Sequence, residues 1–147
     1  MAPADSLNDE IDRLCEEGDA LSDESDFRGA LPLYQKAWTL VPEPKDRSPA
    51  ATWILSALGD THFYLGEYES GISALTRALH CPDGLGNPFV HLRLGQCYFE
   101  TRNLDGAKTE LQKAFEGAGE EIFEDEDPKY ADLIRPEAKG SPQKKRP

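Results

Sequence analysis

Basic residues are scarce in this sequence of 147 residues. Lysine and arginine together number 16 against 28 aspartates and glutamates, so the formal net charge is −12. A protein with this charge is repelled by nucleic acid and by anionic membranes, and neither is expected as its main partner. A basic protein partner fits the charge better.

Long apolar runs are also missing. The mean hydropathy is −0.63, and no stretch approaches the roughly 20 apolar residues that a membrane-spanning helix needs. The N-terminal segment has neither the basic start nor the apolar centre of a signal peptide. We therefore expect a cytoplasmic protein with no membrane partner.

The three cysteines, Cys15, Cys81 and Cys97, are odd in number and far apart, which is typical of free thiols in a reducing compartment. Cys81 and Cys97 with His80 and His91 do not have the spacing of a zinc site, so no metal is expected. The sequence also lacks a nucleophile elbow, a phosphate-binding loop and a dinucleotide-binding fingerprint. It therefore predicts neither an enzyme nor a cofactor.

An internal repeat is the most informative feature that is present. Three segments each contain a glycine, a small residue twelve positions later and an alanine seven positions after that. They are Gly18, Ala30 and Ala37, then Gly59, Gly71 and Ala78, then Gly95, Ala107 and Ala114. Large apolar residues recur around them with the helical period. Each segment thus indicates two helices whose small residues let them approach closely.

The helices are expected at 7–21, 27–40, 49–64, 68–80, 88–100 and 104–116, with a short last helix at about 128–134. Ser48 before Pro49 and Asn87 before Pro88 mark two of the helix starts. No segment alternates with period two, so no strand is expected. The prediction is an all-α fold, a short α-solenoid of three helix hairpins plus a C-terminal capping helix.

The domain organisation follows from these elements. The hairpins would span about 7–42, 49–82 and 88–118, and the cap would span 119–135. Together they form one domain at 7–135. Residues 1–6 are expected to be a disordered N-terminus, and 136–147 a disordered basic tail, because neither has an apolar face.

The repeat resembles the tetratricopeptide repeat (TPR) family. The resemblance rests on Leu58-Gly59, on Leu94-Gly95 with Tyr98, and on Phe27 followed by Ala30, Tyr34, Ala37 and Pro42. It covers about residues 10–116 with three copies in phase. It implies three TPR-like hairpins and a role in binding other proteins.

A narrower resemblance involves residues 79–89, 92–99, 119–123 and 126–130. These are similar to small bacterial Tol–Pal-type TPR proteins, many of which occur beside secreted polymorphic toxins as immunity proteins. The resemblance implies that the chain binds and neutralises a cognate toxin. The alternative is a cytosolic scaffold or secretion chaperone that binds a peptide segment in the same groove.

The TPR resemblance also implies a binding groove, because the first helix of each pair lines the concave side. The groove-facing positions of the family correspond in the first repeat to Asp12, Cys15, Asp19, Ser22 and Asp23. In the second and third repeats they correspond to Trp53, Ser56, Asp60, Phe63, Tyr64, Phe89, Leu92, Gln96, Phe99 and Glu100. The residues expected to bind a partner are these without Asp12, Cys15 and Ser22. They predict a groove that is acidic at one end and aromatic through the middle, suited to a basic protein. Phe63, Phe99 and Leu92 have an alternative role, which is to fill space between helices.

One function of the family is not expected. Relatives that hold the acidic C-terminal tails of heat-shock chaperones use lysine, arginine and asparagine in the groove. The corresponding positions here are Cys15, Asp19, Ser56, Asp60, Leu92 and Gln96.

Acidic residues gather in 1–26 and again in 120–127. Each cluster is either a solvated face or an electrostatic mimic of nucleic acid that attracts a basic toxin such as a nuclease. The sequence leaves the identity of the partner and the oligomeric state open.

Overall fold

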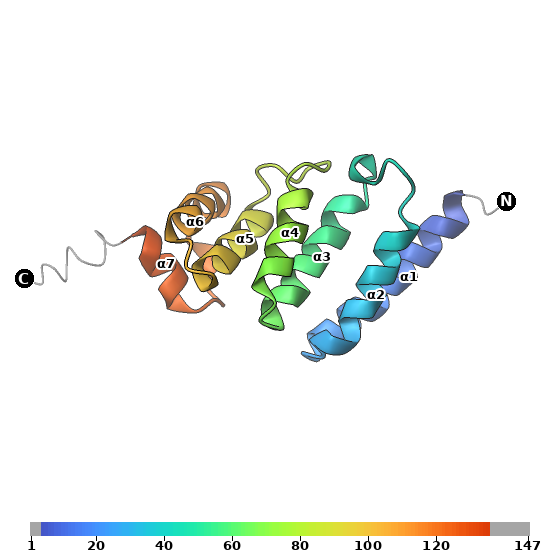
Figure 1. Cartoon of the computed structure of the whole chain (residues 1–147), viewed down its shortest axis with the longest axis horizontal. Coiled ribbons are helices and arrows are strands. Elements are labelled where there is room, and N and C mark those ends of the chain that lie inside the picture. The colour runs from blue at the N-terminus through green and yellow to red at the C-terminus, as the bar shows by residue number, and fades with distance from the viewer. Residues whose placement is uncertain (1–3, 136–147) are drawn as a thin grey trace, which may run out of the picture. The chain divides into compact units, whose positions relative to one another are not determined.

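The computed structural model describes residues 4–135, which form seven α-helices and two short 3₁₀ helices and contain no β-strand (Figure 1). The helices are α1 (Ala4–Asp23), α2 (Phe27–Leu40), η1 (Lys45–Arg47), α3 (Ala51–Tyr64), α4 (Tyr68–Ala78), α5 (Pro88–Glu100), α6 (Leu104–Ala118), η2 (Glu120–Phe123) and α7 (Pro128–Ile134). The predicted all-α class is confirmed. No helix in the described part of the chain has the length and apolar character needed to cross a bilayer.

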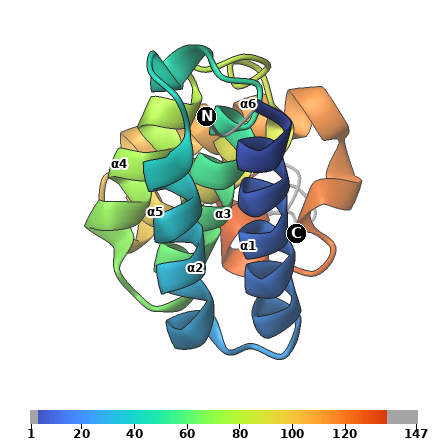
Figure 2. The same ribbon diagram turned by 90° about the vertical axis from the view of Figure 1, so that its right-hand side faces the viewer.

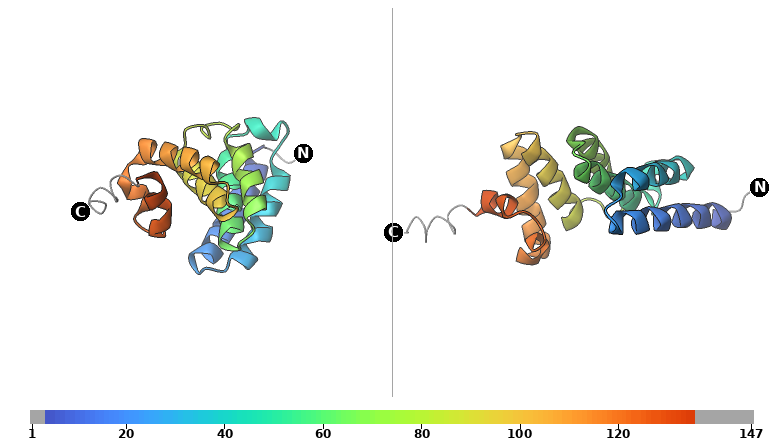
Figure 3. Two further views of the ribbon diagram at one scale, coloured as in Figure 1. Left: turned by 60° about the vertical axis from the view of Figure 1, so that its left-hand side comes forward. Right: turned by 90° about the horizontal axis from the view of Figure 1, so that it is seen from below.

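The chain divides into two compact units, residues 1–85 and 86–147. In the first unit, α1 pairs with α2 and α3 pairs with α4, while α2 also packs against α3 (Figure 2). In the second unit, α5 pairs with α6, and η2 and α7 pack back onto this pair (Figure 3). The predicted hairpins and C-terminal cap are therefore all present as local structures.

The helix boundaries follow the sequence signals closely. The predicted helices 27–40 and 88–100 are confirmed, and Asn87 caps α5 by accepting hydrogen bonds from the backbone N–H groups of Phe89 and Val90. The predicted start at Pro49 is wrong, since α3 begins at Ala51. The backbone carbonyl of Ser48 accepts a 3.0 Å hydrogen bond from the N–H of Ala51, which closes a turn before the helix.

The ends of the chain differ partly from the expectation. The prediction of disorder is wrong for residues 4–6, because α1 already begins at Ala4. Residues 1–3 and the expected basic tail at 136–147 lie outside the described residues.

The repeat glycines hold each hairpin together. A Cβ atom at Gly59 would lie 2.4 Å from the side chain of Leu75, and one at Gly18 would lie 2.8 Å from the ring of Tyr34. At Gly95 the nearest atom of Leu111 would be 2.8 Å away. The missing side chain therefore lets the second helix insert a large residue against the backbone of the first, as the repeat predicts.

The loop between α2 and α3 is held by Lys45 and Arg77. The Lys45 ammonium donates hydrogen bonds to the backbone carbonyls of Trp38 and Val41 at the end of α2, at 2.9 and 2.8 Å. Arg77 of α4 lies 4.8 Å from the centroid of the Trp38 ring and pairs with Asp46 at 2.6 Å. These contacts connect the first hairpin to the second.

Replacing Gly59 with alanine tests the close packing. In an uncrowded helix the change would stabilise the protein by about 1 kcal/mol, because glycine is a poor helix former. Here we expect a loss of about 1–3 kcal/mol in the free energy of unfolding, because the new methyl group displaces Leu75. Urea unfolding measures the sign, and Ser70→Ala, at an exposed position of α4, is the control. A stabilised Gly59→Ala variant would contradict the packing.

Candidate functional site

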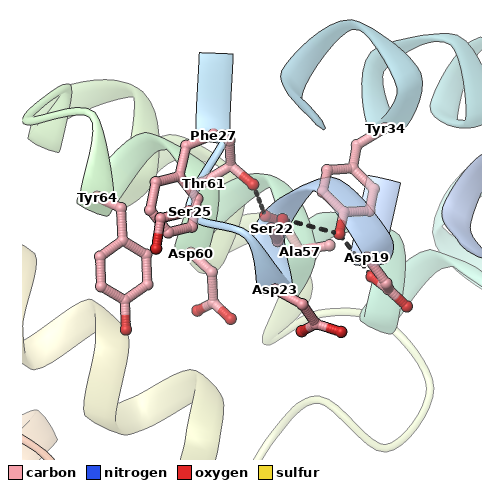
Figure 4. Close-up of a pocket in the computed structure, with 10 residues that line it drawn as sticks. All are labelled: Asp19, Ser22, Asp23, Ser25, Phe27, Tyr34, Ala57, Asp60, Thr61 and Tyr64. Atoms are coloured by element: carbon pink, nitrogen blue, oxygen red, sulfur yellow. Dashed lines mark hydrogen bonds between the residues drawn. The ribbon is translucent and has the colours of Figure 1, made fainter. Parts of the chain in front are cut away.

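An open cleft of about 580 Å³ lies between α1, α2 and α3 in the first unit (Figure 4). It is lined by carboxylates, hydroxyls and aromatic rings, with no basic side chain among the lining residues that the structure describes. The lining residues are Asp19, Ser22, Asp23, Ser25, Phe27, Tyr34, Ala57, Asp60, Thr61 and Tyr64.

The spacing along the helices brings these residues to one place. On α3, Ala57, Asp60 and Tyr64 follow one another at intervals of three and four residues, so they share one face. On α1, Asp19 and Asp23 are four residues apart and lie in the last two turns. The chain then turns sharply and α2 begins at Phe27, which brings an aromatic ring to the same cleft.

The electrostatics of the cleft favour a cation. Asp19, Asp23 and Asp60 each carry a carboxylate, and α1 and α3 both have their C-terminal ends beside it. The C-terminal end of a helix has a partial negative charge, which adds to that of the side chains. The N-terminal end of α2, at Phe27, contributes an opposing partial positive charge, which the three carboxylates outweigh. A lysine or arginine side chain would therefore be attracted, and a carboxylate repelled.

Aromatic rings line the same cleft. Phe27 and Tyr64 are stacked with ring centroids 4.6 Å apart and an interplanar angle of 11°, although they come from different hairpins. Tyr64 is 49% exposed, so its ring remains accessible from solvent. An aromatic face beside carboxylates can hold a cation by cation–π and ionic interactions together.

Tyr34 fixes one of the three carboxylates. Its hydroxyl donates a 2.5 Å hydrogen bond to Asp19, and burial together with this bond raises the pKa of Tyr34 well above its ordinary value. The phenol therefore stays protonated throughout the ordinary pH range. It orients Asp19 at the cleft without cancelling its charge.

The structure brings four of the predicted binding residues into this cleft, namely Asp19, Asp23, Asp60 and Tyr64. Trp53, also predicted, lies in a second cleft of about 300 Å³ between α1 and α3. This cleft is lined by Asn8, Ile11, Asp12, Ser48, Pro49, Ala50 and Trp53.

Two other predicted residues of the first unit have internal contacts. The Ser56 hydroxyl donates to the carbonyl of Thr52 at 2.7 Å. The ring of Phe63 packs between those of Tyr64 and Tyr68, with centroids 5.2 and 5.9 Å away. Phe63 therefore supports the position of Tyr64, which agrees with its alternative role of filling space between helices.

The predicted residues of the second unit are mostly used by its C-terminal cap. Leu92 and Gln96 are 3% and 0% exposed, so neither side chain is accessible to a partner. The Gln96 amide donates to Glu126 at 2.8 Å and accepts from Arg93 at 2.6 Å. Phe89 is 68% exposed at the start of α5.

Phe99 and Glu100 hold α7 in place. The ring of Phe99 meets that of Tyr130 edge to face at 5.2 Å, and Lys129 lies 5.4 Å from its centroid. Glu100 accepts hydrogen bonds from Lys129 at 2.9 Å and from Tyr130 at 2.5 Å. Burial raises the pKa of Glu100, but these two hydrogen bonds outweigh that effect and leave it below the ordinary value.

Sequence reasoning missed Phe27 and Tyr34 as cleft residues. Both lie on α2, whereas the family pattern places groove residues only on the first helix of each pair. The signal that was available is the short turn before Phe27, which brings the start of α2 next to the end of α1.

The second acidic cluster, at 120–127, is not one continuous acidic face. Ile122 and Phe123 of η2 are buried within it, and Glu126 binds Arg93 and Gln96. Its carboxylates are thus partly used to attach the cap.

Two of the four residues considered for zinc binding, His91 and Cys81, are engaged in other contacts. The Nε2 atom of His91 accepts a hydrogen bond from the backbone N–H of Gly86 at 3.1 Å, and its Nδ1 lies 2.6 Å from Glu110. Cys81 donates to the carbonyl of Arg77. Across residues 4–135 no group of three or more metal-ligating side chains could hold a metal ion.

The thiol of Cys15, on α1, should react slowly. Burial raises its pKa to about 11, with further contributions from Asp19 and Asp12, and the residue is 1% exposed. Since the thiolate is the reactive form, we expect alkylation by iodoacetamide at pH 8 to be far slower in the native protein than in urea. Mass spectrometry of tryptic peptides separates the three cysteines. Equal rates for Cys15 in both states would contradict its burial.

Glu100 gives a prediction about pH. Because its folded pKa lies below the ordinary value of 4.5, its carboxylate stabilises the fold above that pH, and the contribution is lost as the pH falls through the folded pKa. We expect Glu100→Gln to lower the free energy of unfolding at pH 7 by about 1 kcal/mol.

The difference between this variant and the unaltered chain should shrink when urea unfolding is repeated near pH 3.5. Glu69→Gln, at an exposed position, is the matched control and should change little at either pH. A difference that is the same at both pH values would show that the carboxylate charge of Glu100 is not what holds α7.

Part of the sequence matches a known protein family. Residues 90–116 match the family model described as the tetratricopeptide repeat. No curated protein matches the sequence.

Several solved structures have the same fold. The type III secretion chaperone SycD of Yersinia enterocolitica, in complex with a peptide of the translocator YopD, is 15% identical, with 87% of this chain and 92% of that chain covered and a TM-score of 0.68. The Sgt2 TPR domain from Aspergillus fumigatus is 21% identical, with 94% and 83% covered and a TM-score of 0.66.

A third similar structure is the first TPR of Spaghetti (RPAP3) bound to the HSP90 peptide SRMEEVD, which is 15% identical, with 89% and 94% covered and a TM-score of 0.65. At these levels of identity the likeness establishes the fold, an all-α arrangement of TPR-type hairpins.

Proposed function

We propose that this chain is a protein-binding module whose acidic cleft between α1, α2 and α3 holds a basic segment of a partner protein. The observation that carries the proposal is the composition of the cleft. Three carboxylates and accessible aromatic rings line about 580 Å³, and no lysine, arginine or histidine is among the residues that line it. Its most complementary ligand is a positively charged side chain.

The similar structures support peptide binding as the mode of action. SycD is in complex with a translocator peptide, and the RPAP3 domain is bound to an HSP90 peptide. A segment bound in the cleft of the present chain would follow the same general mode. This agrees with the second reading of the sequence, a scaffold or secretion chaperone that holds a peptide segment.

The ligand chemistry should nevertheless differ from that of the HSP90 peptide. That peptide, SRMEEVD, ends in three acidic residues out of four. Asp19, Asp23 and Asp60 would repel such an end. We therefore propose a basic ligand for this cleft.

A second proposal is neutralisation of a cognate toxin, with the chain acting as an immunity protein. It is supported by the net charge of −12, which favours a basic protein partner. The similarity of residues 79–89, 92–99, 119–123 and 126–130 to small bacterial Tol–Pal-type TPR proteins, many of them immunity proteins, also suggests it. A basic toxin domain would bind in the same cleft. The two proposals differ in the fate of the partner, which is inhibited in the second case and remains active in the first.

Selection from a random peptide library displayed on phage tests the cleft directly. We expect the unaltered chain to enrich peptides containing lysine or arginine, and the Asp23→Asn/Asp60→Asn variant to lose most of that enrichment. The affinity of selected peptides should fall when the salt concentration is raised from about 50 to 500 mM, because attraction by exposed carboxylates is screened.

The matched control is Glu16→Gln/Glu69→Gln. It changes the net charge by the same amount at two exposed positions outside the cleft. If this control loses basic peptides as strongly as the cleft variant, the selection reflects overall charge, and the proposed site is wrong. Melting temperatures of both variants show whether either change disturbs the fold.

A further inference from the structure

The cleft around Trp53 is a second place where the first unit leaves an aromatic side chain accessible. Trp53 is 43% exposed, and Ile11, Pro49 and Ala50 line the same space of about 300 Å³. Its only charged lining residue within the described chain is Asp12. This composition favours an apolar side chain, with an acidic residue at the edge.

The two clefts lie on one face of the α1–α3 arrangement. On α3, Trp53 and Asp60 are seven residues apart, and on α1, Asp12 and Asp19 are also seven residues apart. Seven residues are close to two helical turns, so each pair points to the same side, separated by about 10 Å along the helix. Asp12 and Trp53 line the cleft around Trp53, and Asp19 and Asp60 line the acidic cleft. The two clefts therefore follow one another in the same direction along both helices.

Small side chains lie between the two clefts. On α1 the intervening position of this face is Cys15, which is 1% exposed, and on α3 it is occupied by Ser56 and Ala57. Cys15 is covered by its neighbours, whereas Ser56 and Ala57 are both half-buried and so partly accessible from solvent. A segment that runs from one cleft to the other would therefore lie along α3, over Ser56 and Ala57.

The second unit contains an example of the same recognition chemistry. Lys129 of α7 lies 5.4 Å from the centroid of Phe99 and 2.9 Å from the carboxylate of Glu100. Phe99 and Glu100 hold positions of α5 that correspond to Phe63 and Tyr64 in the preceding repeat. A lysine on an aromatic ring with a carboxylate beside it is thus a contact that this protein already makes.

We infer that the α1–α3 face holds one partner segment through two anchors, a lysine or arginine at Asp19, Asp23 and Asp60, and a large apolar side chain against Trp53. The inference rests on the proposed function and specifies the partner. Its two anchors are about 10 Å apart, which corresponds to roughly three residues in an extended chain or seven in a helix.

Synthetic peptides with a Gly-Ser background test the two anchors separately. One set contains a single lysine, and a second set adds one leucine at one to eight residues on either side of it. Binding to the full chain is measured by the fluorescence anisotropy of a neutral dye on the peptide. We expect the leucine to increase affinity roughly tenfold at a spacing near three or near seven, and much less at other spacings.

Trp53→Ala should abolish the gain from leucine, so that peptides with lysine and leucine bind this variant no more tightly than the lysine-only peptide does. Leu104→Ala removes a similarly exposed apolar side chain, 48% exposed, in the second unit and should have no effect. The Asp23→Asn/Asp60→Asn variant should weaken both peptide sets. Melting temperatures confirm that each variant is folded.

The possible failures are distinguishable. A gain from leucine that persists in Trp53→Ala, or that does not depend on spacing, would overturn the two-anchor inference while the proposed function stands. Failure of every lysine peptide to bind the unaltered chain would overturn the proposed function and the inference with it.

Discussion

The approach of two helices at a glycine is the contact on which the rest of the structure depends. At Gly18, Gly59 and Gly95 the second helix of the pair places a tyrosine or leucine where a Cβ atom would otherwise stand. This packing sets the rotation of each helix about its axis, and so decides which residues face the partner helix and which face outward. The cleft of the first unit is a consequence of this packing. Its carboxylates, Asp19, Asp23 and Asp60, lie on the sides of α1 and α3 that do not face the partner helix of the pair.

The fold was predictable because its signals are local and repeated. Glycine spacing, capping residues and helical periodicity each depend on residues close in sequence, and they predicted α2 and α5 to the residue. The start of α3 was missed because Ser48 forms a turn through its backbone carbonyl, which no side-chain pattern reveals. The 3₁₀ helix η2 was missed as well, since its acidic sequence resembles a solvated loop.

The candidate site was only partly predictable, since it depends on contacts between hairpins. Asp19, Asp23, Asp60 and Tyr64 followed from the repeat register and do line one cleft. Phe27 stacks on Tyr64 from a different hairpin, and such a contact cannot be inferred from the register of either one. Gln96 and Leu92 occupy equivalent positions in the third repeat but are buried, because a terminal repeat must have its exposed end covered.

The burial of all three cysteines has a practical consequence. A cysteine introduced at an exposed position would be the fastest-reacting thiol of the chain, so a spin label or fluorophore could be attached there without first removing the natural ones. Pairs of such labels, one in each compact unit, would report the separation of the units in solution and any change in it when a ligand is added.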